Sequence, residues 1–251
     1  CEKKWSPRRW PVTETRQVEA GPLDVGKNTA RGLAALVVVL DHAYGLFIEP
    51  YVGGATAMSM FWGQAAHQAV CLFFTVSGFL ITKSILDNMH RNGTFDFLEF
   101  ISSRVARIYP PLIFSVGLCL LFMWCIHGLN LPGSSSANPY QIGSYPQMRE
   151  AFQFSGRDVI GAFQMNNGLL LVNGPLWSLC IEWWIYVAVG FFAYLITCSG
   201  WGRKIIAGVL LTWSFWKLAQ VNQYSYFYSM VWLSGSLIAV CNRHYGWFRN
   251  R

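Results

Sequence analysis

The stretch RGLAALVVVLDHAYGLFI, residues 31–48, decides the fold, because Arg31, Asp41 and His42 are the only Arg, Lys, Asp, Glu or His residues in its apolar run. At about 100° per residue, the eleven-residue step from Arg31 to His42 places both on one helix face, within about 20° of each other. The rise of about 1.5 Å per residue puts His42 roughly 16 Å above Arg31, just past the middle of a hydrocarbon core about 30 Å thick. Ionisable side chains at that depth are candidates for a functional site.

The composition indicates a polytopic membrane protein. Of the 251 residues, 53% are hydrophobic and only 12% are charged, against about 25% charged in soluble domains. The sequence therefore predicts an all-α bundle of six transmembrane helices. The expected spans cover residues 31–49, 60–82, 109–131, 175–197, 205–221 and 226–241. The first and last are short for a span of about 20 residues.

The segments outside these spans are polar or basic. A basic tail is expected at 1–30 and a transmembrane domain at 31–251, with a basic loop at 83–108 and a polar Gly/Ser/Asn-rich loop at 132–174. The seven cysteines form no close CxxC pair, so we expect no metal site.

The net charge of +7 is distributed by side of the membrane. If the N-terminus is cytoplasmic and the spans alternate, all 19 Lys and Arg residues lie on the inner side except Arg149, Arg157 and Lys217. This is the distribution that the positive-inside rule describes. We therefore expect both termini in the cytoplasm. No basic stripe interleaved with aromatics is present, so no nucleic-acid partner is expected.

Two spans carry polar residues on one face. In the second span, a stripe of polar and small residues is expected to face other helices or a wet cavity rather than lipid; it comprises Gln64, Gln68, Cys71, Thr75, Gly78 and Thr82. In the fourth span, Ser178, Glu182 and Tyr186 repeat every four residues. A carboxylate such as Glu182 needs a partner inside a membrane.

Four segments together resemble the acyltransferase 3 family of integral membrane enzymes: RGLAALVVVLDHA (31–43), FFTVSGFLI (73–81), RVARIYP (104–110) and GPLWSLCIEWWIY (174–186). The resemblance implies transfer of an acyl group, expected to be acetyl, from cytoplasmic acyl-CoA to a sugar hydroxyl of a surface polysaccharide, a related glycan or a lipid-linked sugar. It also implies the bacterial inner membrane as the location. Family members usually have more than the six spans expected here, which suggests that this chain is truncated.

The resemblance also assigns residues to the donor. Arg31 and His42 match the family's Arg–ten–His motif, and Arg104 and Arg107 match its paired arginines. Ser77 and Gly78 match its Ser-Gly pair, so the donor site is expected at Arg31, Arg104, Arg107, Ser77 and Gly78. Forked guanidinium donors suit the phosphates of CoA. The arginines could instead be topology anchors or bind lipid phosphates, and the Ser-Gly pair could serve helix packing.

The catalytic candidates are His42, Glu182 and Asp41. A neutral imidazole can take the hydroxyl proton as general base, although an acyl-histidine intermediate stays open. Glu182, which matches the family's acid after Trp-Ser-Leu, could orient His42 or hold the acceptor, or form a structural ion pair. Asp41 lies about 100° round the helix from His42, so it is not an obvious direct partner.

The acceptor is expected near the outer end, where the candidates are His67, Gln64, Trp177 and Ser178. A purely structural interhelical role is the alternative for His67 and Gln64. Two other functions remain open: a transporter or channel component, and an inactive fragment of the same family. No symmetry-related repeat of the kind found in many transporters is evident.

Overall fold

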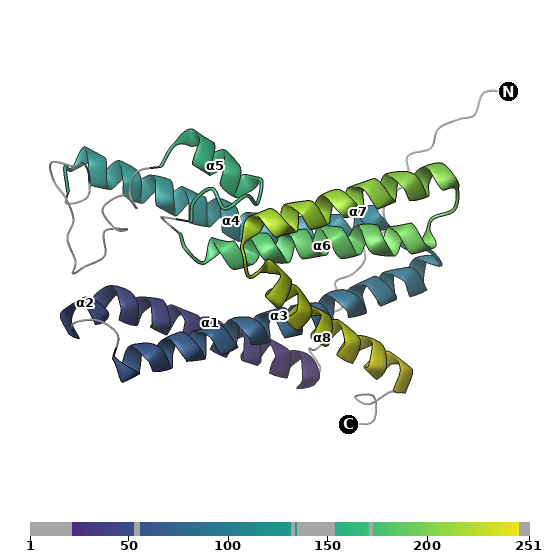
Figure 1. Ribbon diagram of the computed structural model, residues 1–251, viewed down its shortest axis with the longest axis horizontal. Coiled ribbons are helices and arrows are strands. Elements are labelled where there is room, and N and C mark those ends of the chain that lie inside the picture. The colour runs from purple at the N-terminus through teal and green to yellow at the C-terminus, as the bar shows by residue number, and fades with distance from the viewer. Residues whose placement is uncertain (1–21, 53–55, 132–133, 135–153, 171–172, 246–251) are drawn as a thin grey trace, which may run out of the picture.

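The computed structural model describes residues 22–52, 56–131, 134, 154–170 and 173–245. Within these ranges the regular secondary structure is all helical, with no strand, which confirms the all-α part of the expected fold class. The helices are α1 (Pro22–Phe47), α2 (Glu49–Val52), α3 (Ala57–Asn92), α4 (Phe97–Gly128), α5 (Gly156–Phe163), α6 (Leu176–Thr197), α7 (Trp201–Val221) and α8 (Ser225–Tyr245) (Figure 1).

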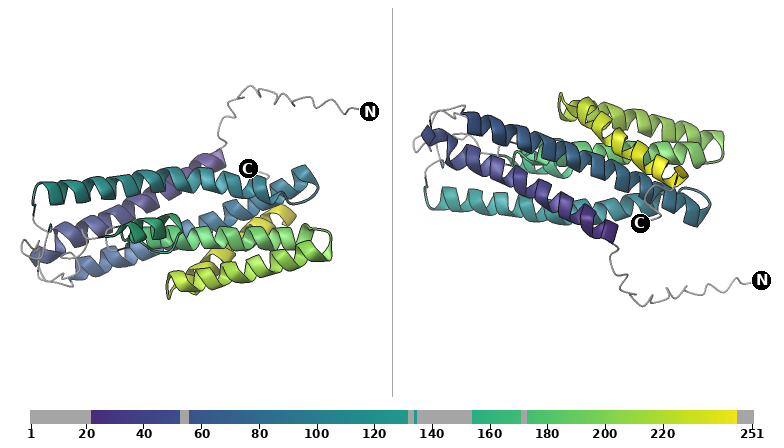
Figure 2. Two further views of the ribbon diagram at one scale, coloured as in Figure 1. Left: turned by 90° about the horizontal axis from the view of Figure 1, so that it is seen from above. Right: turned by 90° about the horizontal axis from the view of Figure 1, so that it is seen from below.

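Six of these helices are long and run along one bundle in alternating directions (Figures 1 and 2). Helix α3 packs against α1 and α8, whereas α6 packs against α7 and α4. The first turn of α1 and the last turn of α8 lie toward the same end of the bundle (Figure 1).

Three helices are long and apolar enough to cross a membrane, namely α3, α4 and α6. Helices α1, α7 and α8 coincide with the other three expected spans but do not meet that criterion within the described residues. These helices indicate a membrane protein, and the count of six spans stays a prediction.

The prediction of a loop at 83–108 is wrong. Helix α3 continues to Asn92 and α4 begins at Phe97, so most of this segment is helical. Gly93 ends α3 in the left-handed conformation, with φ of 69°, which glycine adopts without steric cost. Asp96 then caps α4 by accepting a hydrogen bond from the Glu99 backbone N–H at 3.0 Å.

The ends of two expected spans also need correction. The third span was expected at 109–131, yet α4 begins at Phe97 and runs through Pro110 and Pro111. Such prolines are tolerated in membrane helices, where neighbouring groups satisfy the freed carbonyls. Helix α1 begins at Pro22, nine residues before the expected first span.

In the described part of the polar loop expected at 132–174, the chain forms one helix, α5, between Gly156 and Phe163. A capping box begins it: Asp158 Oδ2 accepts hydrogen bonds from the backbone N–H and the hydroxyl of Ser155. Residues 132–133, 135–153 and 171–172 lie outside the described residues.

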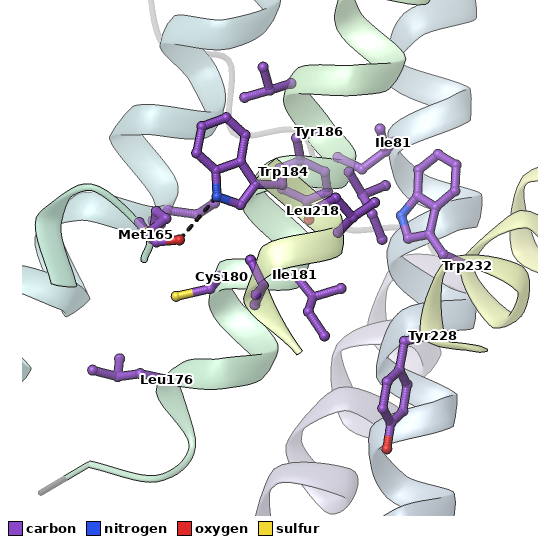
Figure 3. Close-up of a cluster of buried hydrophobic side chains, with 14 of the residues drawn as sticks. Ile81, Met165, Leu176, Cys180, Ile181, Trp184, Tyr186, Leu218, Tyr228 and Trp232 are labelled. Atoms are coloured by element: carbon purple, nitrogen blue, oxygen red, sulfur yellow. Dashed lines mark hydrogen bonds between the residues drawn. The ribbon is translucent and has the colours of Figure 1, made fainter. Parts of the chain in front are cut away.

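Helix α6 forms the centre of the bundle. Ile181, Trp184, Ile185 and Tyr186 are each at most 5% exposed, and they lie between α3, α7 and the segment that follows α5 (Figure 3). The Trp184 indole N–H donates to the Met165 backbone oxygen at 3.0 Å. A buried indole with a satisfied donor fixes the rotation of α6 about its axis.

Helices α3 and α8 approach with their backbones almost in contact. A Cβ on Gly78 would lie 2.0 Å from the Trp232 backbone oxygen, and a Cβ on Gly235 would lie 1.9 Å from that of Thr75. One turn further along α3, Thr82 and Ser236 hydroxyls are hydrogen-bonded at 2.6 Å. The lower half of the predicted polar stripe therefore faces a neighbouring helix, as expected, through small residues of the kind found at membrane-helix contacts.

Candidate active site

Helix α1 carries the first two candidate residues. It is a single helix from Pro22 to Phe47, so the eleven-residue spacing places Arg31 and His42 on the same side of the helix. Arg31 is half-buried, Asp41 is half-buried and His42 is exposed. The imidazole of His42 is therefore accessible from outside the protein core.

Glu182 lies at the centre of a buried polar network between α3 and α6. The Ser77 hydroxyl donates to Glu182 Oε1 at 2.7 Å and is within 2.8 Å of the Tyr186 hydroxyl. Tyr186 also donates to Glu182 Oε1. Ser77 and Tyr186 are 3% and 2% exposed. Two hydroxyl donors thus fix one carboxylate oxygen about 9 Å from the start of α6, estimated from the helix rise.

The three predicted donor-site arginines lie near enough to interact electrostatically with one another, and Arg31 and Arg104 also with this carboxylate. Arg31 and Arg104 each interact electrostatically with Arg107 and Glu182, and also with Tyr186. These side chains come from α1, α4 and α6, so the fold brings together residues far apart in sequence. Three guanidinium groups and one carboxylate leave the cluster with an excess of positive charge. The described partners of Glu182 are these groups and Ser77; none is His42.

Arg104 is held in place more tightly than the other two. Its Nη2 donates to the Ser84 hydroxyl at 2.8 Å, and its guanidinium carbon lies 5.4 Å from the Phe100 ring centre and 6.0 Å from that of Tyr186. Its Nε is buried and has no hydrogen-bond partner among the described residues. An arginine oriented in this way, beside two more, suits the oxygens of a polyanion such as a pyrophosphate.

Ser77 and Gly78 face different neighbours. Ser77 belongs to the Glu182 network beside the arginines. Gly78, about 100° further round α3, touches the α8 backbone at Trp232. The contacts described for Gly78 are therefore packing contacts.

Two of the predicted acceptor residues converge on one tyrosine toward the other end of α3. His67 Nδ1 lies 3.2 Å from the Tyr228 hydroxyl, and its ring stacks on Phe227 with ring centres 5.7 Å apart. Trp177 packs on the same tyrosine, with ring centres 5.0 Å apart. Tyr228 is 5% exposed, whereas His67 is exposed. This cluster of His67, Trp177, Phe227 and Tyr228 is called the aromatic cluster below.

Among the described residues, neither of the other two acceptor candidates forms a hydrogen bond with this cluster. Gln64 is exposed on α3. The Ser178 hydroxyl donates to the Pro175 backbone oxygen at 3.0 Å, within the first turn of α6. Among the residues described, no group of three or more His, Cys, Asp or Glu side chains could hold a metal ion.

Sequence reasoning missed Tyr186, Ser84 and Tyr228 as members of these clusters. Tyr186 had a signal, because it repeats with Ser178 and Glu182 at four-residue steps and must share their face. Ser84 and Tyr228 carry no local motif, since their positions depend on how α3 packs against α4 and α8.

Comparisons with known proteins agree with the resemblance. A family model described as an acyltransferase domain matches residues 26–249. The chain is 30% identical over 166 residues to a protein of Shigella phage Sf6 named O-acetyl transferase, covering 65% of this chain and 44% of that protein. It is 32% identical over 153 residues to protein 2 in the picA locus of Rhizobium radiobacter, covering 61% and 73%.

A third relative is more distant. The peptidoglycan O-acetyltransferase OatA of Listeria monocytogenes is 24% identical over 194 residues, covering 74% of this chain and 28% of that protein. The chain thus spans less than half the length of the phage and Listeria proteins. No solved structure gives a significant match.

Proposed function

Because the chain belongs to the acyltransferase 3 family, we propose that it forms the catalytic region of a membrane-embedded O-acyltransferase. The enzyme transfers an acetyl group from cytoplasmic acetyl-CoA to a sugar hydroxyl of a surface polysaccharide or a related or lipid-linked glycan. The observation that carries this proposal is the mutual electrostatic interaction of Arg31, Arg104 and Arg107, two of which also interact with Glu182. Arg31 in turn shares one side of α1 with His42, which is exposed.

In this proposal the three arginines bind the phosphates of the donor. Arg31 and Arg104 are half-buried, where charge-assisted hydrogen bonds are stronger than in water. The negative charge of Glu182 offsets part of the repulsion between the guanidinium groups. Hydrogen bonds from Ser77 and Tyr186 fix the orientation of its carboxylate. Glu182 is thus assigned to positioning the arginines rather than to orienting His42. Gly78 contributes by allowing α3 and α8 to approach.

His42 acts as the general base. It takes the proton of the sugar hydroxyl while the hydroxyl oxygen forms a bond to the thioester carbonyl carbon. The resulting tetrahedral intermediate collapses, the C–S bond breaks, and the CoA thiolate leaves and takes up a proton. The roughly 16 Å between Arg31 and His42 along α1 separates the phosphate-binding and proton-accepting ends. Asp41, which is half-buried, is assigned to a supporting role beside the base.

The acceptor approaches from the opposite side. His67 and Trp177 of the aromatic cluster, with Gln64 and Ser178 nearby in sequence, are proposed to contact the glycan. An apolar ring surface with one polar edge is suited to sugar recognition, since binding sites combine aromatic walls with few polar groups. Both termini would be cytoplasmic and the bilayer would be the bacterial inner membrane.

The test is transfer of labelled acetyl from acetyl-CoA to candidate glycans in membranes that contain the full-length protein. Wild type should label the glycan, and His42→Ala should abolish labelling while expression and membrane insertion stay unchanged. His244→Ala serves as the matched control, because this exposed histidine lies in the last turn of α8, toward the end of the bundle where α1 begins, whereas His42 lies near the end of α1 (Figure 1). Retained labelling in His42→Ala would refute the assignment of the base. Absence of acetyl-CoA binding by the wild type would instead favour a transporter or channel component.

A further inference from the structure

A pocket of about 520 Å³ lies at the end of α3 that adjoins the turn to α4. It is lined by Leu80, Lys83, Ser84, Asp87, His90 and Arg91. Its volume falls within the range of about 300–1,000 Å³ typical of small-molecule sites. None of these residues was among the predicted site residues.

One residue that lines the pocket is hydrogen-bonded to Arg104. Ser84, which lines it, accepts a hydrogen bond from Arg104 Nη2 at 2.8 Å. Ser77, Leu80, Ser84, Asp87 and Arg91 follow one another at steps of three and four residues along α3, so they share one helix face. This face runs from the Glu182 network to the pocket over about 21 Å.

The charges of the pocket favour an anion. Asp87 is the one acidic residue that lines the pocket, and it pairs with Arg243 at 3.4 Å. Arg91, which also lines the pocket, pairs with Glu99 at 2.6 Å. Lys83 is exposed and has no hydrogen bond or ion pair with any described residue. His90, also exposed, can add a further donor. Lys83 is thus the cation left to bind a ligand.

We propose that this pocket binds a phosphate monoester, the 3′-phosphate on the adenosine of the donor, through Lys83. The inference rests on the proposed function. The pyrophosphate then lies nearer Arg104, and the pantetheine arm leads along the bundle toward His42. The nucleotide end of the donor stays at the membrane surface, where a charged ligand needs no desolvation of the whole molecule.

The experiment measures the affinity of the purified full-length protein in lipid nanodiscs for CoA and for dephospho-CoA, which lacks the 3′-phosphate. For wild type, loss of this phosphate should weaken binding about tenfold, the effect of one charge-assisted hydrogen bond. Lys83→Ala should weaken CoA binding by the same factor and leave dephospho-CoA binding unchanged. Lys83→Arg should retain most of the wild-type discrimination, because it keeps the charge. Lys204→Ala, an exposed lysine at the start of α7, is the matched control.

The outcomes separate this inference from the function on which it rests. If wild type binds CoA and dephospho-CoA equally, or if Lys83→Ala weakens both by the same factor, the 3′-phosphate assignment is overturned while the acyltransferase proposal stands. If neither ligand binds, both fail. Nanodiscs with and without anionic phospholipid form the last arm. An effect of Lys83→Ala that appears only with anionic lipid, whatever the nucleotide, would assign the pocket to a lipid headgroup and overturn the inference.

Discussion

Substitution Gly78→Ala should destabilise the protein, because α3 and α8 have no room for a methyl group at this position. The new Cβ would lie 2.0 Å from the Trp232 backbone oxygen, against about 3.4 Å for an ordinary contact between such atoms. The helices must therefore separate locally by about 1.4 Å. The added Cβ meets the backbone oxygen and carbonyl carbon of Trp232, and these backbone atoms cannot rotate away as a side chain could. Overpacking costs about 1–3 kcal/mol, and this rigid contact belongs at the upper end.

The assay is thermal unfolding of the detergent-solubilised protein. Unfolding is monitored by the reaction of a fluorescent maleimide with thiols that are buried in the folded state, such as that of Cys180, which is 2% exposed. At about 2–4 °C per kcal/mol for a chain of this size, a cost of about 3 kcal/mol lowers Tm by roughly 10 °C. Gly63→Ala on the same helix is the control, since no atom lies within 4 Å of its added Cβ. That change should be neutral or stabilise by up to about 1 kcal/mol. Equal Tm values for the two variants would refute the close backbone contact between α3 and α8.

Three further substitutions test the clusters. Glu182→Gln should lower the free energy of unfolding by about 1–3 kcal/mol, because the arginines lose the charge that offsets their repulsion; unchanged unfolding would mean that they do not crowd around Glu182. Arg104→Lys should raise KM for acetyl-CoA about tenfold, since lysine lacks the fork that reaches Ser84 and a phosphate together; an unaltered KM would remove Arg104 from the donor site. Tyr228→Phe should raise KM for the glycan two- to tenfold through loss of the hydrogen bond to His67, and a change in the donor KM instead would place the aromatic cluster elsewhere in the reaction.

The fold class and the positions of the long helices follow from local sequence. Apolar runs of span length became helices, and the boundaries of α6 match the expected segment to within one residue. The prediction of a loop at 83–108 failed because the charges of this segment suggested a loop. In the structure, residues 83–92 extend α3 and residues 97–108 begin α4, beyond the apolar parts of these helices. The turn between them did have local signals, namely Asn92-Gly93 and the cap pair Asp96 and Glu99.

The site was only partly predictable for a different reason. The four motifs named Arg31, Arg104, Arg107 and Glu182, but nothing in the sequence says that these four converge. Convergence depends on helix packing, to which Gly78 and Gly235 contribute by letting two backbones meet. The role of Glu182 was left open between orienting His42, holding the acceptor and forming a structural ion pair. Its described hydrogen bonds run to Ser77 and Tyr186, and it interacts electrostatically with Arg31 and Arg104.

The central claim is that Arg31 binds the donor and His42 accepts the proton. Its most direct test is to measure the affinity of purified wild type, Arg31→Ala and His42→Ala for acetyl-CoA, together with acetyl transfer by each. Arg31→Ala should weaken donor binding at least tenfold, as expected for one charge-assisted contact. His42→Ala should bind the donor with wild-type affinity and transfer no acetyl group. Undiminished binding in Arg31→Ala, or transfer by His42→Ala, would contradict the account.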